Sequence, residues 1–273
     1  MGNALKNRTH LPNIYLGVIL LLMYVPIVLV IIYSFNESKI SSVWDGFSLK
    51  WYAELFRDRS LFEALLNSII LGVSSSLAAA VIGTLGAVGS AKVELKGKGV
   101  MEYIATLPIM IPEIILGMVF MVFFSLIGLP FGMTTLIIAH TAFCIPCVFM
   151  LVKARLVGMD KSLEEAALDL GASKMRAFFD IVLPLIAPAI ASGMLLAFAM
   201  SFDDVIISVF VTGVDSNTLP IKIYSQLKTG VTPKINALCT LMFGITILLC
   251  GLSLLIGREK KPKKLQSEYK EGN

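Results

Sequence analysis

Charged residues are scarce in this chain of 273 residues. They make up 15% of the sequence, whereas hydrophobic residues make up 56% and the mean hydropathy is +0.83. A soluble domain has about a quarter of its residues charged. The scarcity of charge excludes an ordinary soluble domain and predicts a protein that lies mostly in lipid.

The chain also has little of what catalysis or metal binding requires. It has two histidines, His10 and His140, and four cysteines, of which Cys144 and Cys147 form a CxxC inside an apolar stretch. Two thiols do not complete a tetrahedral zinc site, and no second CxxC is present. We therefore expect no metal site and regard a membrane enzyme, such as a thiol oxidoreductase or a hydrolase, as a poor alternative.

A nucleotide site is also missing from the sequence. No G-x4-G-K-[ST] phosphate loop occurs, and the short stretch Gly97-Lys98-Gly99 lacks the upstream glycine. We predict that this chain is not an enzyme and binds no cofactor itself.

Apolar runs of membrane-spanning length dominate the rest of the chain. A bilayer core of about 30 Å needs roughly 20 apolar residues per helix. We therefore predict an all-α membrane protein with six transmembrane helices. The six predicted spans are approximately 14–35, 65–91, 103–127, 134–155, 185–212 and 235–257.

Lys and Arg are distributed unevenly between these spans. Of the 23, 16 fall in the two termini, in the segments after the second and fourth spans and in the last three residues of the fourth span, and 7 fall in the remaining segments. Positive residues concentrate on the cytoplasmic side, so both termini of this multi-pass membrane protein are predicted to be cytoplasmic. The net charge of +4 then needs no nucleic-acid partner to explain it. The expected divisions are a cytoplasmic segment 1–13, a transmembrane domain 14–257 with a cytoplasmic loop at about 160–184, and a basic tail 258–273.

The cytoplasmic loop has strong local helix signals. Ser162 and Glu165 have the spacing of a capping box, Gly171 suits the left-handed position that ends a helix, and Ser173 can cap a second helix. Leu163, Ala166, Ala167 and Leu170 are expected on one side of the first helix. By these local rules alone, a partner surface and a capped interfacial turn without a partner remain open alternatives.

The loop also carries a longer pattern. Glu165-Ala166-Ala167, three residues, Gly171, nine residues, Ile181, one residue and Leu183-Pro184 give EAA-x3-G-x9-I-x-LP. This pattern resembles the loop by which the permease subunits of bacterial type I ABC importers engage their ATPase subunits. The resemblance implies a MetI-like permease architecture with a coupling helix in this loop. The implied coupling residues are Glu164, Glu165, Ala166, Ala167, Gly171, Ile181, Leu183 and Pro184.

The resemblance implies partners as well. They are a second, homologous permease subunit, two ATPase subunits that bind ATP and Mg, and an extracellular or periplasmic solute-binding protein. Further stretches resemble the spermidine/putrescine branch of the family, and the likeness covers essentially the whole chain. They are 201–208 (SFDDVIIS), 210–213 (FVTG), 219–225 (LPIKIYS) and 230–238 (GVTPKINAL). The implied function is that of a polyamine importer permease. The alternatives are a permease for another small solute and, less favoured, an ATP-independent cation carrier or channel.

Three carboxylates fall within predicted spans. Ionisable residues inside a membrane are costly and normally face protein or water. Glu113 lies midway along the third span, and Asp203 and Asp204 lie in the fifth. The candidate substrate-pathway residues are Asp204, Glu113, Asp203 and Ser208. Asp204 is favoured because it shares a polar stripe with Ser201 and Ser208. The alternative for Asp203 is contact with a neighbouring helix or the partner subunit. The alternative for all three is a structural role, capping broken helix ends or pairing with donors.

The longest outer segment, 36–64, is rich in interface-type aromatics. Trp44, Trp51 and Tyr52 suit a membrane–water interface, and 47–56 can form a short helix along the membrane surface. Ser60 and Glu63 have the spacing of a capping box that opens the second span. A platform for the binding protein and simple membrane anchoring remain equal alternatives for this segment.

Overall fold

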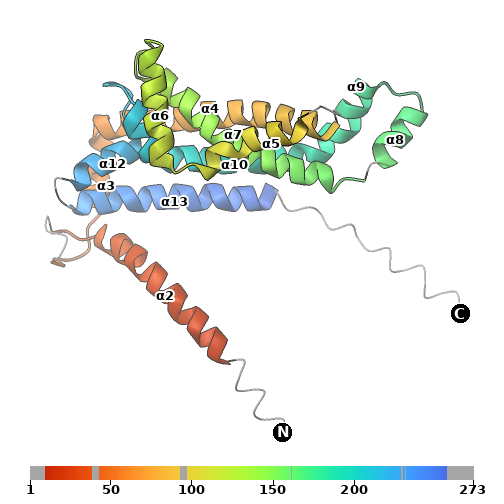
Figure 1. Cartoon of the computed structure of the whole chain (residues 1–273). Coiled ribbons are helices and arrows are strands. Elements are labelled where there is room, and N and C mark those ends of the chain that lie inside the picture. Colours follow the sequence, from red (N-terminus) through yellow and green to blue (C-terminus); the bar gives the residue numbers. More distant parts are fainter. Residues whose placement is uncertain are drawn as a thin grey trace, which may run out of the picture. The chain divides into compact units, whose positions relative to one another are not determined.

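The computed structural model describes residues 10–38, 43–92, 97–160, 162–228, 230 and 232–256. Residues 1–9 of the predicted cytoplasmic segment and residues 258–273, the predicted basic tail, lie outside these ranges. Apart from an isolated bridge between Asn36 and Phe47, the regular structure within them is helical (Figure 1). The elements are α2 (His10–Tyr33), α3 (Lys50–Arg57), α4 (Arg59–Lys92), α5 (Lys98–Met110), α6 (Glu113–Leu126), α7 (Met133–Val157), α8 (Ser162–Asp169), α9 (Lys174–Ala177), the π-helix η1 (Phe178–Val182), α10 (Leu183–Asp203), α11 (Ile206–Val211), α12 (Leu219–Leu227) and α13 (Pro233–Ile256).

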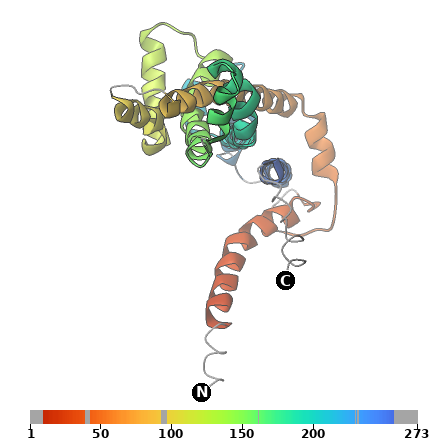
Figure 2. The same ribbon diagram turned by 90° about the vertical axis from the view of Figure 1, so that its right-hand side faces the viewer.

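Helices occupy all six predicted spans. Within the described residues, four helical segments are long and apolar enough to cross a membrane: Ile14–Tyr33, Arg59–Lys92, Met133–Val157 and Lys174–Asp203. The pair α5 and α6 makes a fifth if it is counted as one broken span. The sixth window is helical as α13. The first span, α2, continues through Pro26 as one helix in both views (Figure 1, Figure 2).

Two of the predicted spans are not continuous helices. The third is broken at Ile111–Pro112, because Pro112 cannot donate a backbone hydrogen bond and restricts the residue before it to extended conformations. Ile111 accordingly has φ −84° and ψ 131°. The fifth is broken after Asp203, and α11 begins at Ile206. Each of these two predicted spans is therefore a pair of helices joined by a break.

The chain divides into two compact units. The first comprises the described residues of Met1–Val73, Pro112–His140 and Ser201–Ile247. The second comprises those of Ser74–Ile111, Thr141–Met200 and Leu248–Asn273.

The first unit has an apolar cluster to which α3, α4, α12 and α13 contribute. Its buried residues are Trp51, Leu55, Leu61, Ala64, Leu219, Ala237 and Leu238. The outer segment does form the expected short helix, as α3. Trp51, however, is buried, and its Nε1 donates to the carbonyl oxygen of Asn36 at 2.7 Å. The Trp51 ring thus packs into this cluster and is not exposed on the surface of the unit.

In the second unit, small residues bring helices close together. A Cβ atom on Gly83 of α4 would lie 3.0 Å from Cβ of Val148 of α7, and one on Gly193 of α10 would lie 3.3 Å from Cα of Val148. Membrane helices associate mainly by close packing, which small residues permit. Val148 therefore packs closely against Gly83 of α4 and Gly193 of α10.

The residue that caps the start of α4 is Asp58, and not Ser60 as predicted. Its Oδ1 accepts the backbone N–H groups of Ser60 (3.1 Å) and Leu61 (3.2 Å), and its Oδ2 accepts from Nζ of Lys234 at 2.7 Å. A carboxylate at an N-cap satisfies otherwise unpaired backbone donors. The hydrogen bond from Lys234 holds the pKa of Asp58 below its ordinary value. This side chain thus joins the start of α4 to α13.

We expect Asp58→Asn to lower the stability of the protein by about 1 kcal/mol or less, because Asn keeps the cap but loses the ion pair. A depressed native pKa contributes stability that is present at neutral pH and is lost as the pH falls below about 4. The stability difference between wild type and Asp58→Asn should therefore shrink in acid. Thermal unfolding of the purified protein at several pH values measures it. Glu63→Gln is the control, because Glu63 pairs with the exposed Arg59 and both side chains are accessible to solvent. A difference that stays constant between pH 7 and 3 would contradict the assignment.

Candidate functional site

The first helix of the loop, α8, begins differently from the prediction. Ser162 is the first residue of α8, and its backbone N–H donates to Oδ1 of Asp160 at 3.0 Å. Backbone and side-chain hydrogen bonds from Ser162 lower the pKa of Asp160. The predicted capping box of Ser162 and Glu165 was therefore wrong, because an Asp two residues earlier forms an Asx-type turn with the same donor.

The end of α8 is as predicted. Gly171 has φ +86°, its N–H donates to the carbonyl of Leu168 (2.9 Å), and the N–H of Ala172 donates to the carbonyl of Ala167 (3.0 Å). This pair of bonds is a Schellman motif with glycine in the left-handed position. A Cβ on Gly171 would meet nothing within 4 Å, so backbone conformation alone requires the glycine.

The second part of the loop runs directly into the fifth span. Ser173 accepts the backbone N–H of Arg176 at 3.3 Å, as predicted for a helix cap. The short helix α9 passes through the π-helical turn η1 into α10, where Leu183 donates to the carbonyl of Phe178, five residues earlier. Pro184 has no N–H to donate, and a wider turn at this point tolerates that loss. Ile181 and Leu183 are half-buried and Pro184 is exposed.

One face of the loop is held by its own unit. Glu164 accepts from Nζ of Lys92 at 2.5 Å, and the same ammonium lies 5.4 Å from the ring centroid of Phe178. A cavity of about 730 Å³ lies beside these residues and is also lined by Leu85, Leu156 and other residues of α4 and α7. These contacts tie the loop to the ends of α4 and α7. The side chain of Ala167 is half-buried.

The other face of the loop is apolar and exposed. Leu163 is 48% exposed, Leu170 90% and Phe179 55%, and Glu165 and Ala166 are exposed as well. Leu163, Ala166 and Leu170 lie at the spacing that places them on one side of a helix. The helical hairpin of α8 and α9 (Figure 1) thus presents an apolar surface with small residues to its surroundings.

Asp204 lies in the break between α10 and α11 and caps α11. Its Oδ1 accepts the N–H of Ile207 at 3.3 Å, and its Oδ2 accepts the N–H of Ser208 at 2.9 Å. Asp204 is 8% exposed and Ser208 is fully buried. A buried carboxylate that accepts two backbone N–H groups is occupied in holding the helix start.

His140 of α7 joins this network. Its Nδ1 lies 2.8 Å from Oγ of Ser201, and its Nε2 lies 3.0 Å from Oγ of Ser208 and 3.5 Å from Oδ2 of Asp204. The signal in the sequence was a single histidine within an apolar span and a facing stripe of Ser201, Asp204 and Ser208. The predicted stripe does come together, but around His140 and across a break in the helix.

Asp203 and Glu113 have exposed side chains. Asp203 is the last residue of α10, and Glu113 is the first residue of α6. The N-terminus of a helix favours a negative charge such as that of Glu113. Helices α6 and α11 pack closely, because a Cβ on Gly117 would lie 2.6 Å from Cδ2 of Phe210. The accessible carboxylates are thus Asp203 and Glu113, whereas the sequence favoured Asp204 over Asp203.

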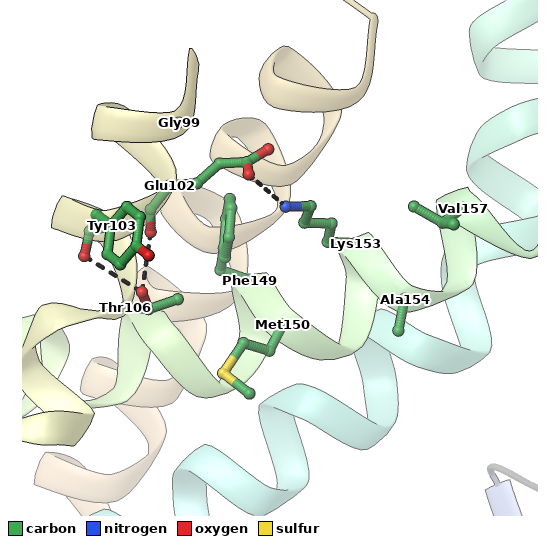
Figure 3. A pocket seen from close by; sticks show the side chains of 9 residues that line it. All are labelled: Gly99, Glu102, Tyr103, Thr106, Phe149, Met150, Lys153, Ala154 and Val157. Atoms are coloured by element: carbon green, nitrogen blue, oxygen red, sulfur yellow. Dashed lines mark hydrogen bonds and ion pairs between the residues drawn. The ribbon is translucent and has the colours of Figure 1, made fainter. Parts of the chain in front are cut away.

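A further pocket lies between α5 and α7 in the second unit. Its volume is about 660 Å³, and Tyr103, Phe149 and Met150 are among its lining residues. Figure 3 shows Glu102 and Lys153 pointing toward one another at its wall, with Nζ and Oε2 2.7 Å apart. Lys153, near the end of α7, thus has an ion-pair partner within the second unit.

Comparison with known proteins identifies the family. Residues 79–259 match the family of the binding-protein-dependent transport system inner membrane component. The chain belongs to this family. It is 37% identical to the spermidine/putrescine transport system permease protein PotC of Haemophilus influenzae, over 93% of this chain and 98% of that protein. It is 42% identical to the putrescine transport system permease protein PotI of Escherichia coli, over 81% of this chain and 82% of that protein.

The fold has counterparts among solved structures. A bacterial ABC transporter that imports the polysaccharide alginate matches with a TM-score of 0.73 at 16% identity, over 93% of this chain and 98% of that one. The MetNI methionine ABC transporter matches with a TM-score of 0.61 at 19% identity, over 78% of this chain and 98% of that one. The all-helical architecture is therefore that of an ABC importer permease, as predicted.

Family membership defines the kind of subunit this is. The chain is a multi-pass permease of the bacterial inner membrane and works in a complex with an ATPase and a periplasmic binding protein. It is the non-catalytic membrane component, and ATP is bound by the partner ATPase.

Proposed function

We propose that this chain is a permease subunit of an ATP-driven importer of polyamines such as spermidine and putrescine. The observation that carries the proposal is the similarity, at 37% to 42% identity along most of the chain, to permeases named for these substrates. The sequence stretch from Ser201 to Ser208, which carries the resemblance to the polyamine branch, is also the break that presents Asp203 and buries Asp204.

The exposed carboxylates suit such a substrate. A polyamine is an extended polycation, and its ammonium groups form their strongest hydrogen bonds with carboxylates. Asp203 and Glu113 are accessible, and each lies where an apolar helix begins or ends. In this proposal Asp203 and Glu113 line the pathway, while Asp204 and Ser208 support it from behind.

The coupling loop, about 160–184, would transmit the motion of the ATPase. Its exposed apolar face, which includes Leu163, Ala166 and Leu170, is the surface that docks, and Lys92 holds Glu164 on the opposite face. The π-helical connection into α10 makes the loop continuous with the helix that ends at Asp203. Movement of the loop would therefore reach the pathway along a single helix.

The complete transporter in this proposal contains a second, homologous permease subunit, two ATPase subunits that bind ATP and Mg, and a polyamine-binding protein. The six-helix domain 14–257 lies in the bilayer, and the segments 1–13 and 258–273 and the coupling loop face the cytoplasm, as the positive-inside bias favours. Transport proceeds by alternating access. ATP closes the ATPase dimer, the coupling loop follows, and the pathway opens outward.

Reconstitution tests the proposal. The chain and its cognate partners are incorporated into proteoliposomes with ATP in the compartment that the ATPase faces, and uptake of labelled spermidine is measured. We expect uptake that requires ATP and binding protein and that unlabelled putrescine or spermine reduces, whereas an unrelated cation such as choline does not. Uptake without ATP would favour a carrier or channel. An active transporter that ignores all polyamines would favour a permease for another solute.

A further inference from the structure

His140 lies in the first unit beside the break between α10 and α11. It is fully buried, and its imidazole contacts residues on both sides of the break in the fifth span. Ser201 belongs to α10, before the break, and Ser208 belongs to α11, after it. A single side chain of α7 thus links the two helices that the break separates.

The contacts of His140 match the hydrogen-bonding capacity of a neutral imidazole. A neutral imidazole has one donor nitrogen and one acceptor nitrogen, and a serine hydroxyl can serve as partner to either. Both ring nitrogens have a serine hydroxyl at 2.8 and 3.0 Å. Asp204 is the acidic group that faces the ring, with its Oδ2 3.5 Å from Nε2. The ring therefore completes a network with Ser201, Ser208 and Asp204, and of these residues Asp204 also accepts backbone N–H groups at the start of α11.

This network determines which carboxylate is accessible. Asp203 is the last residue of α10 and Asp204 lies in the break, so the two neighbouring side chains have different surroundings. When Asp204 is held inward by Ile207, Ser208 and His140, Asp203 must point elsewhere, and it is exposed. Without the imidazole, two hydroxyls and the Asp204 carboxylate would lose a buried partner, which destabilises this arrangement of the break.

We propose that His140 is a positioning residue for transport: it fixes the break between α10 and α11 so that Asp204 stays inside and Asp203 faces the pathway. The proposal rests on the proposed function for the role of Asp203. It assigns His140 no contact with the substrate.

Two variants separate positioning from packing. His140→Gln keeps an amide that can reach the place of Nε2, beside Ser208 and Asp204, whereas His140→Leu has a comparable size but no polar atom. We expect His140→Leu to lower polyamine uptake per assembled complex by about tenfold, because buried polar groups lose their partner, and His140→Gln to recover most of it. In an Asp203→Asn background, His140→Leu should have little further effect, since both changes act through the same carboxylate. Equal uptake per complex by the Leu and Gln variants would overturn the proposal.

A second measurement needs no transport. In a cysteine-free background, Asp203→Cys and Asp204→Cys are compared for reaction with a water-soluble maleimide in the assembled complex. We expect rapid labelling at position 203 and slow labelling at 204, and we expect His140→Leu, but not His140→Gln, to slow the labelling of position 203. Unchanged labelling at 203 in the Leu variant would contradict the positioning role even if polyamines prove not to be the substrate. If the wild-type complex does not take up polyamines but shows the expected labelling pattern, only the proposed function is contradicted.

Discussion

Polyamine uptake should fall at least about tenfold in Gly171→Val, although the complex should still insert in the membrane. The φ angle of +86° at Gly171 lies in the left-handed region. This conformation costs a residue with a Cβ about 1–2 kcal/mol, and it is least favourable for a β-branched residue. Since nothing lies within 4 Å of a Cβ placed there, the damage comes from the backbone. The Schellman motif would open, and the angle between α8 and α9 would change. Stimulation of the ATPase by loaded binding protein should be lost together with uptake.

Two matched variants sharpen this test of the loop. Gly171→Asn should retain most of the activity, because Asn tolerates the left-handed conformation. Gly89→Val is the control in the same unit, since Gly89 has open space around it and no positive φ. Uptake and ATP hydrolysis are measured per assembled complex in proteoliposomes. If Gly171→Val transports normally, or if Asn is as harmful as Val, the loop does not couple in the way proposed.

Removing both exposed carboxylates should also lower uptake strongly. We expect the double variant Asp203→Asn and Glu113→Gln to lose about tenfold in spermidine uptake per complex, because two carboxylates that attract the polycation are removed. A tenfold loss corresponds to about 1.4 kcal/mol of attraction. Membrane abundance should be nearly unchanged, since both side chains are exposed. Glu63→Gln, which removes an exposed carboxylate near the start of α4, should leave uptake unchanged.

Asp204 should behave differently from its neighbour. Asp204→Ala removes the acceptor for the N–H groups of Ile207 and Ser208 and leaves His140 without a carboxylate. Loss of an N-cap costs about 1 kcal/mol and loss of a buried hydrogen-bond partner about 1–3 kcal/mol. Abundance of the assembled complex should therefore fall more than uptake per complex. The pathway model fails if the double variant at Asp203 and Glu113 transports at the wild-type rate while Asp204→Asn alone abolishes uptake.

The sequence by itself determined the features that depend on local chemistry. The six helical windows follow from the length of apolar chain that a bilayer requires. The turn at Gly171 and the cap at Ser173 depend on backbone conformation and on donors within three or four residues, and both have the expected geometry. The EAA pattern identified the family because its residues stand at fixed distances along one segment. Such features need no knowledge of neighbouring helices.

The tertiary structure alone decided the features that depend on residues far apart in the chain. Asp58 caps α4 and also meets Lys234, 176 residues later, which no local rule anticipates. Trp51 is buried because α12 and α13 bring apolar residues to it. The difference in exposure between Asp203 and Asp204 has the same origin. The two carboxylates are adjacent in the sequence, but Asp204 is buried, with its Oδ2 3.5 Å from Nε2 of His140, a residue more than 60 positions earlier. A buried carboxylate is stable only where such partners converge, and it is the packing of distant helices that brings them together.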